Sequence, residues 1–258
     1  MEPLQTSKER KMNPWSRPTA AAAQPQARTV DQGLRSYMLK VYNYMASGVL
    51  LTGIVAYFAA NSETLINAMY AVNAQGQMSP TGLGWLIAFA PLGFVLFLGF
   101  RLQHMSYQSA QLAFWGFASL MGLSLMSIFL TFTGESIARV FFITAAMFGG
   151  MSIYGYTTNR DLTSMGSFLI MGVWGILLAS VVNIFLGSSL LHFAVSILGV
   201  FIFLGLTAYD TQKLKSTYYQ FSGHGDMLAK SSIMGALSLY LDFINLFIMM
   251  MRLFGERR

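Results

Sequence analysis

Apolar segments of about twenty residues, separated by short polar stretches, fill the chain from Tyr37 onward. About twenty residues is the length at which an α-helix, rising 1.5 Å per residue, crosses the roughly 30 Å hydrocarbon core of a bilayer. The Gly187–Ser188 link is so short that the segments on either side of it should form an antiparallel hairpin. The first loop, Asn61–Thr81, is the longest and could dip back into the membrane interface. The pattern predicts seven membrane-spanning helices near Met38–Ala60, Gly84–Phe100, Ala110–Phe132, Ile137–Thr157, Met165–Leu186, Ser189–Thr211 and Ile233–Phe254.

The segment before these helices has a different character. Residues 1–36 are polar and basic, contain Pro14, Pro18 and Pro25, and show no apolar period. Such a segment has little to bury, so we expect a disordered basic tail. The remainder, residues 37–258, should form one seven-helix transmembrane domain.

Composition supports the membrane interpretation. The 258 residues are 55% apolar and only 10% charged, whereas soluble domains carry roughly a quarter charged residues. The chain has no cysteine, which excludes disulfides and thiolate metal sites. Its net charge of +6 comes from basic residues before and between the apolar segments. That distribution indicates membrane orientation rather than a nucleic-acid interface.

The basic residues are distributed unequally between the two sides of the predicted bundle. Twelve Lys and Arg residues fall on the side of the amino terminus and four on the other. The positive-inside rule therefore predicts a cytoplasmic amino terminus and, with seven spans, an external carboxyl terminus. The basic Arg252–Arg258 end argues against this, and a last segment that only re-entered the membrane would leave both ends in the cytoplasm.

Two carboxylates lie within predicted spans: Asp210, late in the sixth, and Asp242, well inside the seventh. An aspartate at a helix centre costs about 2.5–3.5 kcal/mol on insertion scales. Such residues face the bundle interior and commonly mark an ion or proton pathway. The structural alternatives are a helix-end cap for Asp210 and a hydrogen-bonded buried acid for Asp242.

A polar stripe accompanies Asp242 on the seventh predicted helix. Residues at spacings of three and four share one face of a helix, and this face should point to other helices or water rather than lipid. In the sixth span, Thr207 shares the face of Asp210. Thr207, Ser238 and Asn245 are therefore candidate pathway-lining residues. The stripe consists of Ser231, Gly235, Ser238, Asp242 and Asn245.

Several other polar residues admit plainer explanations. Arg101 ends the second span on the side of Asp210, where it could be an ordinary interfacial arginine or a cation held against the aspartates. Glu135 and Arg139, four residues apart, should form a structural ion pair. The three histidines, His104, His192 and His224, show no metal-ligand spacing and are interpreted as incidental.

Two classes of intramembrane protease share a short motif with the chain, and neither fits it. Gly122-Leu123-Ser124-Leu125 superficially resembles the serine motif of rhomboid proteases, but His192 lies at the wrong depth to serve Ser124. Tyr209-Asp210 matches the first presenilin motif. The second requires Gly-x-Gly-Asp, where this chain reads Leu239-Tyr240-Leu241-Asp242. We expect no enzymatic activity and no cofactor.

Two sequence stretches around the aspartates carry a family resemblance, namely Ala208-Tyr209-Asp210-Thr211-Gln212-Lys213-Leu214-Lys215 and Ala236-Leu237-Ser238-Leu239-Tyr240-Leu241-Asp242-Phe243-Ile244-Asn245-Leu246-Phe247. They closely resemble the signature of the Bax inhibitor-1 (transmembrane Bax-inhibitor-motif) family, and in particular its bacterial YccA-like branch. The resemblance extends from about Leu34 to the end. It implies an all-α polytopic membrane protein whose last helix is enclosed by the other six, and, in bacteria, an inner-membrane location.

The resemblance also implies a function. It is that of a proton-sensitive calcium leak, gated where Asp210 and Asp242 share a proton and contact an arginine, here Arg101. The two carboxylates would form a weak, transient calcium site, suited to cargo rather than to a resident ion. The alternative is a regulatory partner of a membrane-bound AAA protease or translocon, in which the basic tail makes the contact and the aspartates are structural. The expected partners are the bilayer, calcium or other cations and, in the alternative, such a protease. No nucleic-acid partner is expected.

Overall fold

The computed structural model of the chain describes residues 24–72, 78–101 and 104–258, with side chains from residue 32 onward. Within this part, seven helical stretches are long and apolar enough to cross a membrane, which confirms the all-α polytopic prediction. The span predicted over Ala110–Phe132 is divided in the structure, where α5 follows α4 directly. The spanning helices are α1 (Gln24–Ala60), α3 (Gly82–Arg101), α4 (Tyr107–Ser124) with α5 (Met126–Thr131), α6 (Gly134–Thr157), α7 (Thr163–Leu186), α8 (Ser189–Phe221) and α9 (Gly225–Phe254).

The first helix begins earlier than the apolar pattern predicts. It starts at Gln24, so it includes residues 24–36 of the segment predicted to be a disordered tail. Glutamine, alanine, arginine and leucine in this stretch all favour helix, and a proline such as Pro25 is tolerated in a first turn, where its missing N–H would have no partner. Residues 1–23 of the predicted tail lie outside the described residues.

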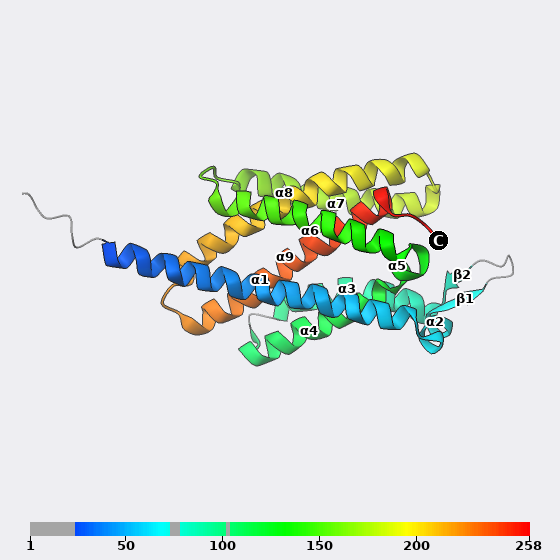
Figure 1. Ribbon diagram of the computed structural model, residues 1–258, viewed down its shortest axis with the longest axis horizontal. Helices are drawn as coiled ribbons and strands as arrows, with labels where there is room; N and C mark the ends of the chain where they lie inside the picture. Colours follow the sequence, from blue (N-terminus) through cyan, green and yellow to red (C-terminus); the bar gives the residue numbers. More distant parts are fainter. Residues whose placement is uncertain (1–23, 73–77, 102–103) are drawn as a thin grey trace, which may run out of the picture.

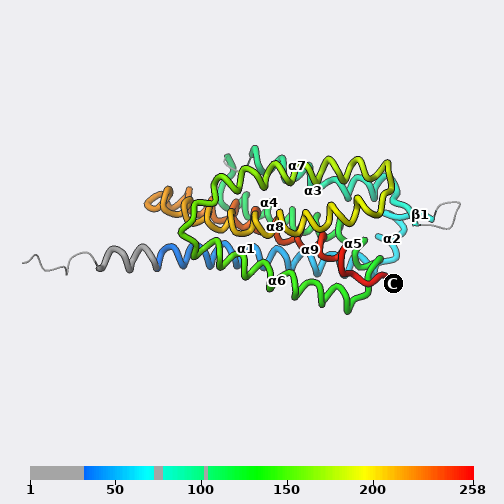
Figure 2. Tube along the Cα trace, turned by 90° about the horizontal axis from the view of Figure 1, so that it is seen from above, coloured from blue at the N-terminus to red at the C-terminus, as the bar shows by residue number. Residues whose placement is uncertain are grey.

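The long first loop contains secondary structure of its own. A short helix, α2 (Glu63–Met69), leads into strand β1 (Tyr70–Val72), which pairs antiparallel with β2 (Met78–Pro80). The Thr81 backbone N–H and hydroxyl donate to the carbonyls of Met69 (2.9 Å) and Ala68 (2.7 Å), which ties the hairpin back to α2. Figure 2 shows the hairpin at the same end of the bundle as the carboxyl terminus.

The last helix lies deepest in the bundle. Of the most apolar 18-residue stretch of α9, 72% is buried, against 39% in α8, the next highest. α9 packs against α1, α4, α6 and α8, while α3 packs mainly on α4 and α7 mainly on α8. In Figure 1, α9 runs obliquely between the side formed by α6 and α8 and the side formed by α1 and α4. Contact with these four helices makes α9 central; its enclosure by all six stays a prediction.

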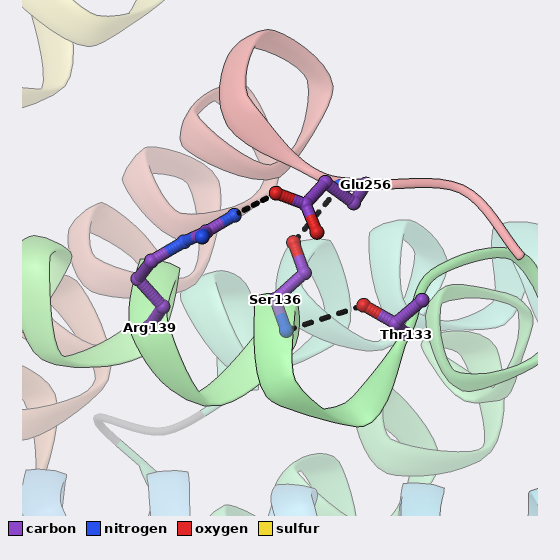
Figure 3. A network of polar contacts seen from close by, with 4 residues as sticks. All are labelled: Thr133, Ser136, Arg139 and Glu256. Carbon is purple, nitrogen blue, oxygen red and sulfur yellow. Dashed lines mark hydrogen bonds and ion pairs between the residues drawn. The ribbon is translucent and has the colours of Figure 1, made fainter.

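The carboxyl-terminal residues are fastened to the start of α6, as Figure 3 shows. The Glu256 backbone carbonyl accepts from the Thr133 N–H (3.0 Å), and the Glu256 N–H donates to Ser136 Oγ (2.9 Å). Glu256 Oε1 also pairs with Arg139 Nη2 at 2.6 Å. Arg139 therefore pairs with Glu256 and not with the predicted Glu135, because the returning chain brings a carboxylate directly to the guanidinium. We call residues 255–258 with Thr133, Ser136 and Arg139 the terminal clasp.

Candidate ion pathway between the last two helices

The last two helices are longer than the membrane requires. α8 has 33 residues and α9 has 30, joined by a three-residue turn, so each extends beyond a hydrocarbon core that about twenty residues span. Residues 212–221 of α8 include several polar and basic side chains, so an apolar pattern ends at Thr211 although the helix does not. Asp210 therefore lies well inside α8, not at its end, and a helix-end cap is excluded as its role.

Close contacts fix how α8 and α9 are aligned. A Cβ on Gly235 would overlap the side chain of Leu214, and one on Gly199 would overlap Met249. This antiparallel alignment places Asp210 opposite Ser238, four residues before Asp242 in α9. The two carboxylates are thus offset by about one helical turn, or about 6 Å along the axis.

A cleft of about 590 Å³ opens between α8 and α9 at the end of the bundle that carries the predicted cytoplasmic loops. Of the lining residues, Asp210 in α8 and Ser238 in α9 lie farthest along their helices from the α8–α9 turn. The ion pair Lys230–Asp226 (3.1 Å) lies near that turn. Ser231 and Gly235 of the predicted polar stripe line the same cleft, as expected for residues that share a helix face. Its full lining is His104, Asp210, Lys213, Leu214, Thr217, Phe221, Asp226, Met227, Lys230, Ser231, Met234, Gly235 and Ser238.

Asp242 lies one turn beyond the base of this cleft. Its residue is 6% exposed, and its Oδ2 atom is buried without a hydrogen-bond partner among the described residues. A buried polar atom left unpaired costs about 1–3 kcal/mol, and more when it is charged. The alternative of a structural, hydrogen-bonded acid therefore does not account for this oxygen.

A second cavity, of about 520 Å³, approaches Asp242 from the other end. It reaches that end at Asn61, Gly134 and Arg258, and it meets α9 at Phe243 and Ile244. The four residues of α9 from Leu239 to Asp242 line neither of these two cavities. They form a barrier of about 6 Å along the helix, and Asp242 is its only ionisable carboxylate.

Two kinds of contact close this barrier. The Tyr240 hydroxyl lies 2.6 Å from Thr52 Oγ1, which in turn donates to the Ala118 carbonyl at 2.8 Å. On the other side, the Phe243 ring packs edge-on against Phe141 and Phe148, with ring centroids 5.5 Å apart in both pairs. The structure therefore has the two cavities separated, in a closed arrangement.

The three predicted pathway-lining residues take different positions. Ser238 lines the cleft. Thr207 is fully buried and its hydroxyl donates to the Phe203 carbonyl of its own helix (2.8 Å). Asn245 likewise donates to Leu241 in its own helix (2.8 Å), beyond Asp242. The lining role stays a prediction for Thr207 and Asn245, whose polar groups already have partners.

Arg101, the predicted third member of the gate, is exposed at the end of α3. The ion pairs of the described residues are Arg139–Glu256 and Lys230–Asp226, so Arg101 contacts neither aspartate in this state. Lys213, one turn after Asp210, lines the cleft with it, as does Lys230, which pairs with Asp226. His104, interpreted from sequence as incidental, also lines the cleft; its place in the short loop after Arg101 is the signal that could have identified it.

Comparison with known proteins identifies the family of this chain. A family model described as "Inhibitor of apoptosis-promoting Bax1" matches residues 34–258. The chain belongs to the Bax inhibitor family. It is 51% identical over 231 residues to the uncharacterized protein RP147 of Rickettsia prowazekii, covering 90% of this chain and 94% of the relative. It is also 46% identical over 229 residues (88% and 94%) to the inner membrane protein YbhL of Escherichia coli, and 35% identical over 228 residues (87% and 92%) to the uncharacterized protein YrjE of Lactococcus lactis.

This Bax inhibitor family protein has few groups that could hold a metal ion. Among its described residues, no three His, Asp or Glu side chains converge on one point. Asp210 and Asp242 could contribute carboxylate oxygens, the ligands that calcium prefers, but a stable calcium site needs six to eight. Two carboxylates alone therefore do not make a stable calcium site, and their predicted role in gating stays a prediction.

Proposed function

We propose that this Bax inhibitor family protein is a pH-sensitive cation leak pathway of the bacterial inner membrane, with calcium as its cargo. Asp210 and Asp242 form its gate. The observation that carries the proposal is the position of Asp242: its Oδ2 has no partner among the described residues, and it lies inside the barrier that separates two opposed cavities.

Protonation controls the gate through charge repulsion. When one of the two carboxyl groups is protonated, the pair carries at most one negative charge, the repulsion is absent and the α8–α9 contact stays closed. When both are ionised in a medium of low dielectric, they repel each other strongly. Repulsion favours separation of α8 and α9 near Ser238, which extends the cleft towards Asp242. Joining the cleft to the second cavity also requires the contacts of Tyr240 with Thr52 and of Phe243 with Phe141 to part.

A cation is also attracted to the open gate. The ionised carboxylates offer oxygen ligands to calcium, and binding at only two carboxylates is weak enough to permit release on the other side. Lys213 shares the cleft with Asp210, so it limits the negative charge of the cleft and opposes accumulation of cations there. The proposal therefore predicts slow leakage rather than fast conduction.

The test is ion flux through the purified chain in liposomes at several pH values, measured separately with calcium, potassium and protons. Asp210→Asn and Asp242→Asn should each abolish the pH dependence of flux, because one neutral partner removes the repulsion. Asp226→Asn is the matched control, since Asp226 lines the same cleft but pairs with Lys230. It should retain the parent's pH profile.

Two outcomes would count against the proposal. If both gate variants kept the parent's pH-dependent flux, the aspartates would not be the gate. If the parent itself carried no cation at any pH, the pathway would not exist.

The binding role, as partner of a membrane protease, stays a prediction, since the predicted basic tail lies largely outside the described residues. Deleting residues 2–23 separates the two ideas while leaving α1 intact. Flux should survive the deletion if the chain is a leak pathway, whereas capture of a protease should fail if the tail is the contact.

A further inference from the structure

A polar groove lies on the outside of the bundle, between α1 and α4, away from the gate. It encloses about 900 Å³ and takes its lining almost entirely from α1, with Trp115 of α4 as the opposite wall. Arg35 and Lys40 supply two positive charges, and none of the lining residues is acidic. The groove therefore has the charge of a site for an anion.

The depth of the groove in the membrane indicates what kind of anion. Counting about twenty residues back from Ala60, the end of α1, places the hydrocarbon boundary near Lys40. Arg35 lies about 7.5 Å farther out, at the level of lipid headgroups. Asn43, which is exposed, lies one turn deeper, where hydrocarbon offers polar atoms no partner. Ser47 lies two turns deeper, and its hydroxyl donates to the Tyr44 carbonyl (2.8 Å).

The groove is held in shape by neighbouring aromatic residues. The Lys40 ammonium lies 4.8 Å from the centre of the Tyr107 ring. The Tyr107 hydroxyl lies 2.6 Å from that of Tyr44, another lining residue. Lys40 is thereby held along the groove, and Trp115 has the amphipathic side chain typical of the membrane interface.

From these features we propose that the groove binds the headgroup of an acidic phospholipid. Arg35 and Lys40 contact the phosphate and the acidic headgroup, the Asn43 amide faces the glycerol esters, and the acyl chains continue along the apolar surface of α1 below Ser47. The lipid would satisfy polar groups that otherwise face hydrocarbon, and it would be recognised by charge at one end and polarity along the groove.

The proposal can be tested by native mass spectrometry of the full chain in detergent. Phosphatidylglycerol and phosphatidylcholine with identical acyl chains compete for binding, and the parent should prefer phosphatidylglycerol. Each interfacial cation contributes about a fivefold preference, so Arg35→Gln with Lys40→Gln should reduce the ratio roughly 25-fold. Arg160→Gln with Lys215→Gln removes two charges that do not line the groove and should leave the ratio within about twofold of the parent.

Further measurements distinguish the lipid from other possible occupants of the groove. Glycerol 3-phosphate in excess should not displace the lipid, because it lacks the acyl chains; displacement would indicate a site for a free phosphate compound instead. If the double variant does not fold, Arg35→Gln alone should still lower the ratio about fivefold, since Arg35 is exposed. An equal loss in both double variants, no preference in the parent, or cross-links between α1 helices of two copies through this groove would each overturn the proposal.

Discussion

Replacing Asp242 with asparagine should make the protein more stable while disabling its gate. The substitution keeps the size of the side chain and removes only its ability to ionise. In the parent, the residue is 6% exposed and Oδ2 has no hydrogen-bond partner among the described residues. An ionised carboxylate in that position loses its hydration and receives little in return.

The expected gain in unfolding free energy follows from the cost of burying Asp242 Oδ2 without a partner. A buried unpaired polar atom costs about 1–3 kcal/mol and a charged one more. Asparagine still leaves a polar atom at the same place, so it recovers only the part due to charge. We expect Asp242→Asn to raise the free energy of unfolding by about 1–2 kcal/mol at pH 8. For a chain of this size that corresponds to an increase in melting temperature of about 2–4 °C per kcal/mol.

The measurement is thermal unfolding in detergent at pH 8 and pH 5. At pH 5 the parent can take up a proton at the gate, so its disadvantage relative to Asp242→Asn should shrink. Asp226→Asn is again the control, because Asp226 is 74% exposed at its side chain and its ion pair with Lys230 contributes at most about 1 kcal/mol. That variant should melt close to the parent at both pH values.

The reasoning would be refuted by the opposite order of stability. If Asp242→Asn melted below the parent at both pH values, the Asp242 carboxylate would be making a stabilising hydrogen bond. If it gained stability equally at pH 5 and pH 8, the gain would not come from removing charge.

Three smaller predictions concern the barrier and the bundle ends. Tyr240→Phe removes the bond to Thr52 (2.6 Å) and should cost about 1 kcal/mol in unfolding free energy while increasing leakage at pH values where the parent is closed, as liposome flux would show. Glu256→Gln breaks an ion pair whose side chains are 49% and 65% exposed, so calorimetry should detect a loss below about 1 kcal/mol. Hydrogen bonds from the hydroxyl and N–H of Thr163 hold the pKa of Asp161 below its usual value. This stabilising effect is present above the unfolded-state pKa and is lost as pH falls through the folded-state pKa. Melting curves of Asp161→Asn should therefore lack the part of the parent's acid sensitivity that lies below about pH 4.

Apolar periodicity was sufficient to predict the seven spans, because lipid imposes one length on every helix that crosses it. It could not predict where α8 ends, since Thr211 marks a change in polarity, not in backbone conformation. The predicted span therefore ended one residue after Asp210, whereas the structure places Asp210 well inside α8. The tight contacts at Gly235 and Gly199 supply the missing alignment, and such contacts depend on helix pairing that no local pattern contains.

Candidate residues were predicted best where burial is costly and least well where position depends on packing. An aspartate in an apolar helix is conspicuous in any sequence, so Asp242 was identified directly. Arg101 and His104 are three residues apart, and only the packing of α3 decides which of them lines the cleft. The terminal clasp was missed for the same reason: Glu256 and Arg139 are distant in sequence, and Glu135 offered a nearer partner.

The contacts between α8 and α9 also indicate where the gate can move. Gly235 packs on Leu214 on one side of the Asp210–Ser238 level, and Gly199 packs on Met249 far on the other. Sliding one helix along the other would drive side chains into these close contacts, which interiors resist because they are densely packed. Separation of the helices between the two contacts does not require that. In the proposed gate, repulsion between the carboxylates acts within this stretch, so a small local parting of α8 from α9 extends the cleft towards Asp242 while both ends of the pair stay packed.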